Sequence, residues 1–220
     1  MERTGFFIMI NAKRTHKIRW QNNARIISIE KNYNIIILTT LIGFGIIVGA
    51  LIISKASLNL SGSISVIYGN YVSAIREKSF WTNLTDTFFT SIIYLVLIFI
   101  MGTNAVGIPF IYFITCIKGI SIGIINGYLY ASFGFKGVGF STLVLFPYAL
   151  ISGVIIILAG DSAIKLSRGI FLDLINKGST AREITIKKYC INFVIYTAFF
   201  IIASVIDAIF KLSFSEIFNI

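Results

Sequence analysis

The sequence predicts an all-α fold, a polytopic membrane helix bundle with five transmembrane helices and amphipathic surface helices. Its 220 residues have a mean hydropathy of +0.88, and 56% are apolar while only 13% are charged. A soluble domain of this length needs far more polar surface to cover its core. The apolar residues gather in long stretches and the basic residues lie beside them, which is typical of a chain dissolved in lipid.

Five stretches have the roughly 20 mainly apolar residues that a membrane-spanning helix requires. A short uncharged segment, residues 102–107, separates the second stretch from the third and predicts a tight turn between two antiparallel helices. The expected spans are residues 35–53, 84–101, 108–130, 140–159 and 191–210.

The basic residues predict the orientation of these spans. Thirteen of the nineteen Lys and Arg residues lie before residue 35 or between residues 161 and 190. Cytoplasmic segments are the ones enriched in Lys and Arg, so the N-terminus is expected inside and the C-terminus outside. We therefore expect a basic cytoplasmic segment at 1–34, a transmembrane domain at 35–210 and a short outer tail at 211–220.

The longest outer segment carries aromatic residues that suggest a partner-binding surface. Tyr68 and Tyr71 follow helical spacing, and Phe80 and Trp81 come shortly after them. This pattern fits an amphipathic helix on the outer membrane face. A simple segment leading into the next span fits it equally well. A second surface helix is expected on the cytoplasmic side at Ile164–Ile175.

Glycines recur every four residues in the third expected span, at Gly119, Gly123 and Gly127, and Gly45 and Gly49 repeat the spacing in the first. Such stripes let another helix backbone approach closely. They serve either packing inside the bundle or self-association. A homo-oligomer is therefore one of the two alternatives that the glycine pattern leaves.

Lys118 lies near the middle of the third span, where an ammonium group costs at least about 2.5 kcal/mol. Three explanations stay open: a structural buried charge, a site for an anionic group or partner, or a side chain that reaches the interface. Pro109 and Pro147 are expected to start or kink the third and fourth spans.

No catalytic, cofactor or metal site emerges from the sequence. Gly102 and Gly107 have the spacing of a phosphate loop, but Ile108 and Pro109 replace the required Lys and Ser or Thr. The single histidine, His16, lies in the basic N-terminal segment. The net charge of +10 is explained by membrane flanks, and no aromatic–basic groove points to nucleic acid.

The central residues resemble the stage II sporulation protein M family. The similarity is carried by the turn Gly102–Pro109, the Lys118–Gly119 pair, the glycine-spaced span and a proline in the fourth span. The sequence departs from the family pattern after Pro147, where Tyr148 and Ala149 replace a frequent Gln-Asn pair.

The resemblance implies a membrane scaffold in the mother cell of an endospore-forming bacterium, active during engulfment. Such a protein is expected to lie in the septal membrane and to hold two cell-wall hydrolases, a lytic transglycosylase and an amidase or endopeptidase. In that role Lys118, Gly119 and Pro109 define the bundle and carry no chemistry.

A small permease or transporter subunit is the alternative. In that case Lys118, Asn104 and Asn126 line a path, and an ATPase docks on Ile164–Ile175.

Overall fold

The computed structural model describes residues 33–55, 79–176 and 182–218. The chain divides into two compact units, Met1–Ile37 and Leu38–Ile220. Of the first unit only residues 33–37 are described, as the start of the helix Tyr33–Lys55. The site and packing described below lie within the second unit.

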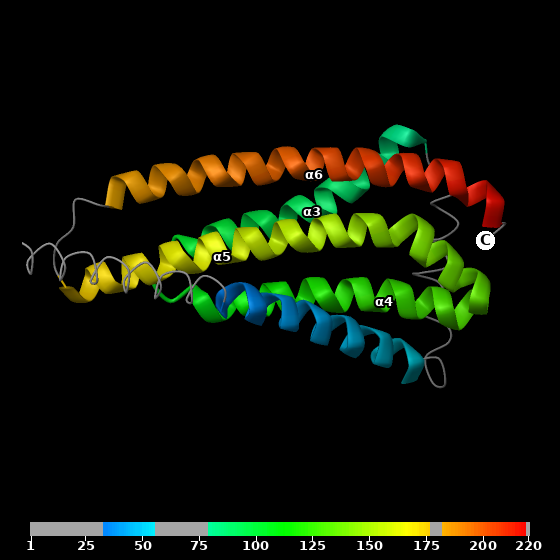
Figure 1. Cartoon of the computed structure of the whole chain (residues 1–220), viewed down its shortest axis with the longest axis horizontal. Helices are drawn as coiled ribbons and strands as arrows, with labels where there is room; N and C mark the ends of the chain where they lie inside the picture. The colour runs from blue at the N-terminus through cyan, green and yellow to red at the C-terminus, as the bar shows by residue number, and fades with distance from the viewer. Residues whose placement is uncertain (1–32, 56–78, 177–181, 219–220) are drawn as a thin grey trace, which may run out of the picture. The chain divides into compact units, whose positions relative to one another are not determined.

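The described residues are helical and contain no strand, which confirms the all-α prediction. After the helix Tyr33–Lys55 come α3 (Phe80–Gly102), α4 (Ile108–Phe140), the π-helical turn η1 (Ser141–Leu145), α5 (Phe146–Asn176) and α6 (Arg182–Phe218). Within the second unit, α3, α5 and α6 pack on one another, and α4 packs on α3 and α5 (Figure 1).

Within these described ranges, four helical segments are long and apolar enough to cross a membrane: Tyr33–Lys55, Phe80–Gly102, Ile108–Leu174 and Ile186–Ser213. The third contains 67 residues because α4, η1 and α5 follow one another without an interruption. It includes both the third and the fourth span expected from the sequence. The multi-pass character of the chain is thus confirmed, whereas the count of five spans and their orientation stay predictions.

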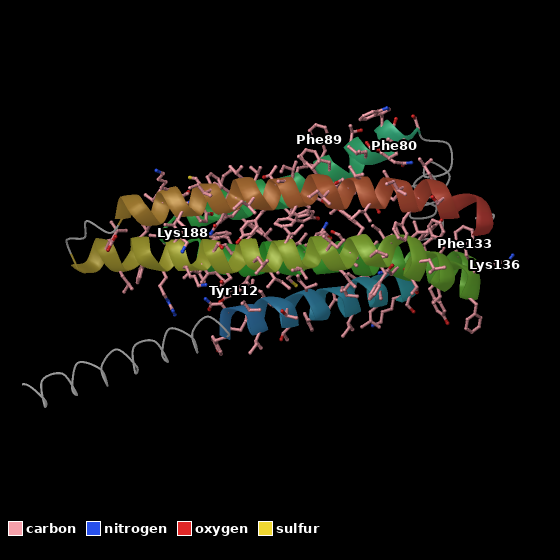
Figure 2. The ribbon with its side chains drawn as sticks, turned by 45° about the horizontal axis from the view of Figure 1, so that its top comes forward. Phe80, Phe89, Tyr112, Phe133, Lys136 and Lys188 are labelled. Carbon is pink, nitrogen blue, oxygen red and sulfur yellow. The ribbon has the colours of Figure 1, made fainter. Side chains whose placement is uncertain are left out.

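The long third segment is not straight, because the chain reverses direction between α4 and α5 (Figure 1). Gly134 has a φ of 56° and a ψ of −132°, a conformation that only glycine adopts readily. The hydroxyl of Ser141 donates a hydrogen bond to the Asn126 side chain across the reversal. Figure 2 shows Phe133 and Lys136 at this end of the bundle.

Pro147 is the second residue of α5, the helix that follows η1. Proline cannot donate the backbone hydrogen bond of a helix interior, and its ring collides with the preceding turn. The wider π-helical turn just before it is a common local adjustment. Pro109 likewise occupies the first turn of α4, where no backbone donor is needed.

The prediction of a separate surface helix at Ile164–Ile175 is wrong. These residues continue α5 without a break, and Ile164 and Leu166 are buried. The prediction failed because helical periodicity shows which face of a segment is apolar but not what covers that face. Helix α6 also extends to Phe218, well past the expected end of the last span at residue 210.

The main core lies among all the long helices of the second unit. It contains aliphatic side chains of α3, α4 and α5 together with aromatic side chains of α6. A smaller cluster, Leu129, Phe140, Val144 and Leu145, fills the reversal between α4 and α5. Large apolar side chains such as Phe113, Val154 and Val194 remain exposed along the helices, as expected where lipid replaces water.

Candidate functional site

Helix α3 turns a polar face toward its neighbours. Asn83, Thr87 and Ser91 recur every four residues and are all buried. Polar side chains are costly against lipid, so the helix directs this face into the bundle, where other helices supply hydrogen-bond partners. The polar face decides which side of α3 packs inward.

A buried ion pair between Asp207 and Lys211 of α6 meets this polar face. The Lys211 ammonium lies 2.6 Å from Asp207 Oδ2, and the side chains of the two residues are 6% and 0% exposed. Thr87 of α3 donates to the same carboxylate oxygen at 2.8 Å and accepts from Lys211 at 3.1 Å. The three side chains therefore join α3 to α6.

The second carboxylate oxygen of Asp207 is buried and has no hydrogen-bond partner among the described residues. A buried carboxylate oxygen that lacks a donor is costly. The ion pair with Lys211 offsets part of this cost, because each of the two charges is buried with its counter-ion.

Lys118 of α4 is also buried inside the bundle, with 5% of its surface exposed. Its ammonium lies 4.9 Å from the centre of the Tyr94 ring and 5.8 Å from that of Tyr148. Aromatic faces attract a cation, but more weakly than a carboxylate does. No carboxylate lies within ion-pair distance of Lys118 in the part of the chain that the structure describes.

The two tyrosines are held in place by hydroxyl groups. The Tyr94 hydroxyl lies 2.9 Å from Ser121 Oγ, which in turn donates to the Ile117 carbonyl at 3.0 Å. The Tyr148 hydroxyl is hydrogen-bonded to Ser91. Both rings are therefore fixed beside the Lys118 ammonium.

These groups line a partly open cavity of about 210 Å³ between α3, α4, α5 and α6. Lys118 and Asn126 line it from α4, and Asp207 and Lys211 line it from α6. This volume has room for several water molecules and its walls are polar enough to hold them. Tyr148 and Ala149, the pair that departs from the family pattern, also face this cavity.

Asn104 was expected to line a path with Lys118 and Asn126, but it does not line the cavity that contains those two residues. It belongs to the turn between α3 and α4, where its side-chain amide donates to the Ile100 carbonyl at 3.1 Å. Its own carbonyl accepts from Ser167 of α5 at 2.6 Å. Only Lys118 and Asn126 of the three share a cavity.

The turn itself has the tight form expected of it. Backbone hydrogen bonds run from Thr103 to Ile100, from Asn104 to Met101 and from Gly107 to Asn104. A Cβ atom on Gly107 would lie 1.7 Å from the Met101 carbonyl oxygen, so a larger residue does not fit there.

The glycines of α4 lie against the helix Tyr33–Lys55. A Cβ atom would lie 2.4 Å from the Ile42 carbonyl oxygen if placed on Gly119, and 2.1 Å from that of Ile46 if placed on Gly123. In return, Gly45 and Gly49 lie against the backbone of α4. At Gly127 the space is less tight, with Ala50 Cα at 3.1 Å.

The four expected partner-binding aromatics divide into two pairs. Tyr68 and Tyr71 lie outside the described residues. Phe80 and Trp81 begin α3, with their rings edge to face at 5.6 Å, and Trp81 is 71% exposed.

The sequence reasoning missed the pairing of Asp207 with Lys211. Lys211 was assigned to an outer tail, although its distance of four residues from Asp207 is the spacing at which opposite charges meet on one helix. Thr87 gave no signal of its own, because its role depends on contact with another helix.

The fold and this polar interior define the chain as a multi-pass helix-bundle membrane protein with a charged cavity between its helices. Residues 36–210 match the family described as stage II sporulation protein M. The chain belongs to this family, which confirms the resemblance seen in the sequence. The family is not a known enzyme family. No curated protein and no solved structure matches the chain.

Proposed function

We propose that the protein is a non-enzymatic scaffold that localises peptidoglycan hydrolases at the septal membrane during engulfment. Its membership in a sporulation family carries the proposal. The partners are a septal lytic transglycosylase and an amidase or endopeptidase, both acting outside the mother-cell membrane. The apolar helices supply a membrane anchor, and the exposed Trp81 at the start of α3 supplies a surface for such partners.

The proposal includes five spans with the N-terminus inside and the C-terminus outside. The reversal at Gly134 supports two separate crossings by α4 and α5. The positive charge of the segments before residue 35 and after residue 161 supports the orientation. In this arrangement the start of α3 lies at the outer face, where the hydrolases act.

Trp81 is the described residue best suited to contact a partner. It is large and exposed, and its ring contacts that of Phe80. Aromatic side chains of this kind commonly dominate protein interfaces. An interfacial Trp also anchors helices at the lipid headgroups, so the two roles need to be separated by experiment.

A pull-down from detergent-solubilised sporulating cells separates partner binding from membrane anchoring. Trp81→Ala and Tyr71→Ala are expected to reduce hydrolase recovery several-fold while membrane insertion is unchanged. Phe89→Ala is the matched control, since Phe89 is also on α3 and 62% exposed (Figure 2). Normal hydrolase recovery by both variants, or an equal loss in the control, would contradict this surface.

The permease subunit is a second candidate, favoured by the cavity between Lys118 and Asp207. It predicts that an ATPase, and no hydrolase, is recovered in the same pull-down. It also predicts that Lys118→Met abolishes flux in a correctly inserted protein. The burial of Ile164 and Leu166 leaves only the exposed side of that part of α5, including Phe171 and Leu174, for an ATPase.

A further inference from the structure

We propose that the cavity between α3, α4, α5 and α6 binds a small zwitterion, a molecule with a carboxylate at one end and a primary ammonium group at the other. The carboxylate binds the Lys118 ammonium, and the ammonium group of the ligand donates to Asp207. Trp81 does not line this cavity, so the site is separate from the proposed scaffold surface and does not depend on that function.

The charges that line the cavity are balanced. Asp86 and Asp207 contribute two carboxylates, and Lys118 and Lys211 contribute two ammonium groups. A ligand with a net charge of either sign would disturb this balance in a place where Lys118, Asp207 and Lys211 are buried. The lining therefore favours a ligand whose own charges sum to zero.

Two buried polar groups of this lining lack a partner in the described part of the chain, and they have opposite character. The Lys118 ammonium is a donor that lies beside the Tyr94 and Tyr148 rings and has no hydrogen-bond acceptor among the described residues. Oδ1 of Asp207 is an acceptor without a donor. A single ligand that satisfies both groups has to accept a hydrogen bond at one end and donate one at the other.

Charge distinguishes a zwitterion from water or another neutral ligand. Aromatic rings attract the Lys118 ammonium more weakly than a carboxylate does. A carboxylate at Lys118 supplies a counter-ion as well as a hydrogen bond, and hydrogen bonds of charged groups are roughly twice as strong as neutral ones. At the other end, the ammonium group of the ligand donates to Oδ1 of Asp207, the oxygen that is not engaged by Lys211.

The two binding groups are separated along the bundle. Thr87 of α3 is hydrogen-bonded to Asp207, whereas the ring of Tyr94 on the same helix lies beside the Lys118 ammonium. These positions are seven residues apart, which is about 10 Å along a helix. The two charges of the ligand are therefore expected to be separated by several atoms, as in an amino acid whose amino group is at the far end of its chain.

The size and access of the cavity suit such a molecule. Its volume of about 210 Å³ exceeds the roughly 150 Å³ of an engineered protein cavity that binds benzene. The cavity is partly open, and Asp86 and Thr90 line it from exposed positions on α3. A small polar molecule is therefore expected to enter from that side.

The test uses the full chain purified in a maltoside detergent, with γ-aminobutyrate as the probe. Butyrate lacks the ammonium group and butylammonium lacks the carboxylate, so each control compound tests one end of the ligand. Isothermal titration calorimetry measures binding, and the thermal unfolding midpoint measures stabilisation at matched ionic strength. The probe is expected to bind and to raise the midpoint, whereas each control compound is expected to bind about tenfold more weakly or worse.

Lys118→Met is expected to weaken the binding of γ-aminobutyrate about tenfold or more, because the carboxylate then loses its charged partner. The matched control is Lys188→Met, which removes the same charge from an exposed position on α6 and is expected to bind the probe as the wild-type protein does (Figure 2). Ala149→Leu keeps the charged side chains but fills part of the cavity, and it is expected to weaken binding by a similar factor.

The proposal is overturned if γ-aminobutyrate binds no more tightly than butyrate and butylammonium do, since the cavity then holds water only. Equal binding of the probe by Lys118→Met and Lys188→Met would also overturn it. Should Lys118→Met fail to fold, Ala149→Leu takes its place, and unchanged binding in that variant contradicts the assigned cavity. None of these outcomes bears on hydrolase recovery, which tests the scaffold function separately.

Discussion

At the scale of single residues, buried charge explains how α3 and α6 are joined. Asp207 and Lys211 form an ion pair with almost no exposure, and Thr87 contacts both. A buried ion pair is expensive to assemble and more expensive to break, because the remaining charge then lacks its counter-ion. Replacement of one member of the ion pair is therefore expected to lower the free energy of unfolding much more than replacement of both members by apolar residues.

Asp207→Ala is expected to lower the free energy of unfolding by about 3–5 kcal/mol, since it leaves the Lys211 ammonium buried without its carboxylate. The double variant Asp207→Leu with Lys211→Met is expected to recover most of that loss. Denaturant unfolding in mixed micelles measures both. A double variant as unstable as the single one would show that the charges themselves hold the helices together.

At the scale of helices, glycine spacing sets how closely α4 and the helix Tyr33–Lys55 approach. The α4 backbone lies within contact distance of residues 42–53 only because its facing positions lack side chains. The reversal between α4 and α5 depends on a different property of glycine, the positive φ of Gly134. Substitutions at the contact glycines of α4 therefore test the close helix packing, and a substitution of Gly134 tests the positive φ.

Gly123→Ala is expected to destabilise the bundle by about 1–3 kcal/mol, because its new Cβ atom would meet the Ile46 carbonyl oxygen at 2.1 Å. Gly43→Ala is the control on the helix Tyr33–Lys55, since nothing lies within 4 Å of its Cβ position. The control is expected to be neutral or slightly stabilising, as alanine favours helices. Equal thermal unfolding midpoints for the two variants would contradict this close contact.

Gly134→Ala is expected to cost about 1–3 kcal/mol through backbone strain alone. The Cβ position of Gly134 has no neighbour within 4 Å, so no collision contributes. Gly153→Ala, at an equally open position inside α5, is the matched control. Thermal unfolding in detergent compares them, and a Gly134 variant as stable as the control would argue against the positive φ.

At the scale of the whole molecule, the 67-residue segment Ile108–Leu174 is too long for a single crossing of the membrane. A straight helix of that length would measure about 100 Å, more than three times the hydrocarbon thickness. The hydrogen bond between Asn126 of α4 and Ser141 of η1, together with the packing of α4 on α5, shows that the segment folds back on itself instead. Two crossings by this one segment follow if both ends of each helix reach water.

Cysteine labelling in intact cells tests this topology. After replacement of Cys116 and Cys190 by alanine, Lys136→Cys is expected to react with an impermeant maleimide from outside. Lys188→Cys is expected to react only after the membrane is permeabilised. Both positions are exposed in the structure, and labelling of both from the same side would exclude the five-span arrangement.

The helical class, the membrane environment, the family and the approximate positions of the apolar helices could all be predicted from the sequence alone. These properties follow from hydropathy, local spacing and a few glycine and proline positions, which neighbouring residues in the chain reveal. The tight turn at residues 102–107 belongs to the same group, because its hydrogen bonds join residues close together in sequence.

Which polar residues contact one another became clear only from the three-dimensional structure. Lys118 had three open explanations, and the structure places it in a cavity beside Tyr94 and Tyr148, from two other helices. Thr87 joined Asp207 across 120 positions of the chain. The physical reason is that a buried polar group is defined by the partner that compensates its burial, and that partner comes from a distant helix.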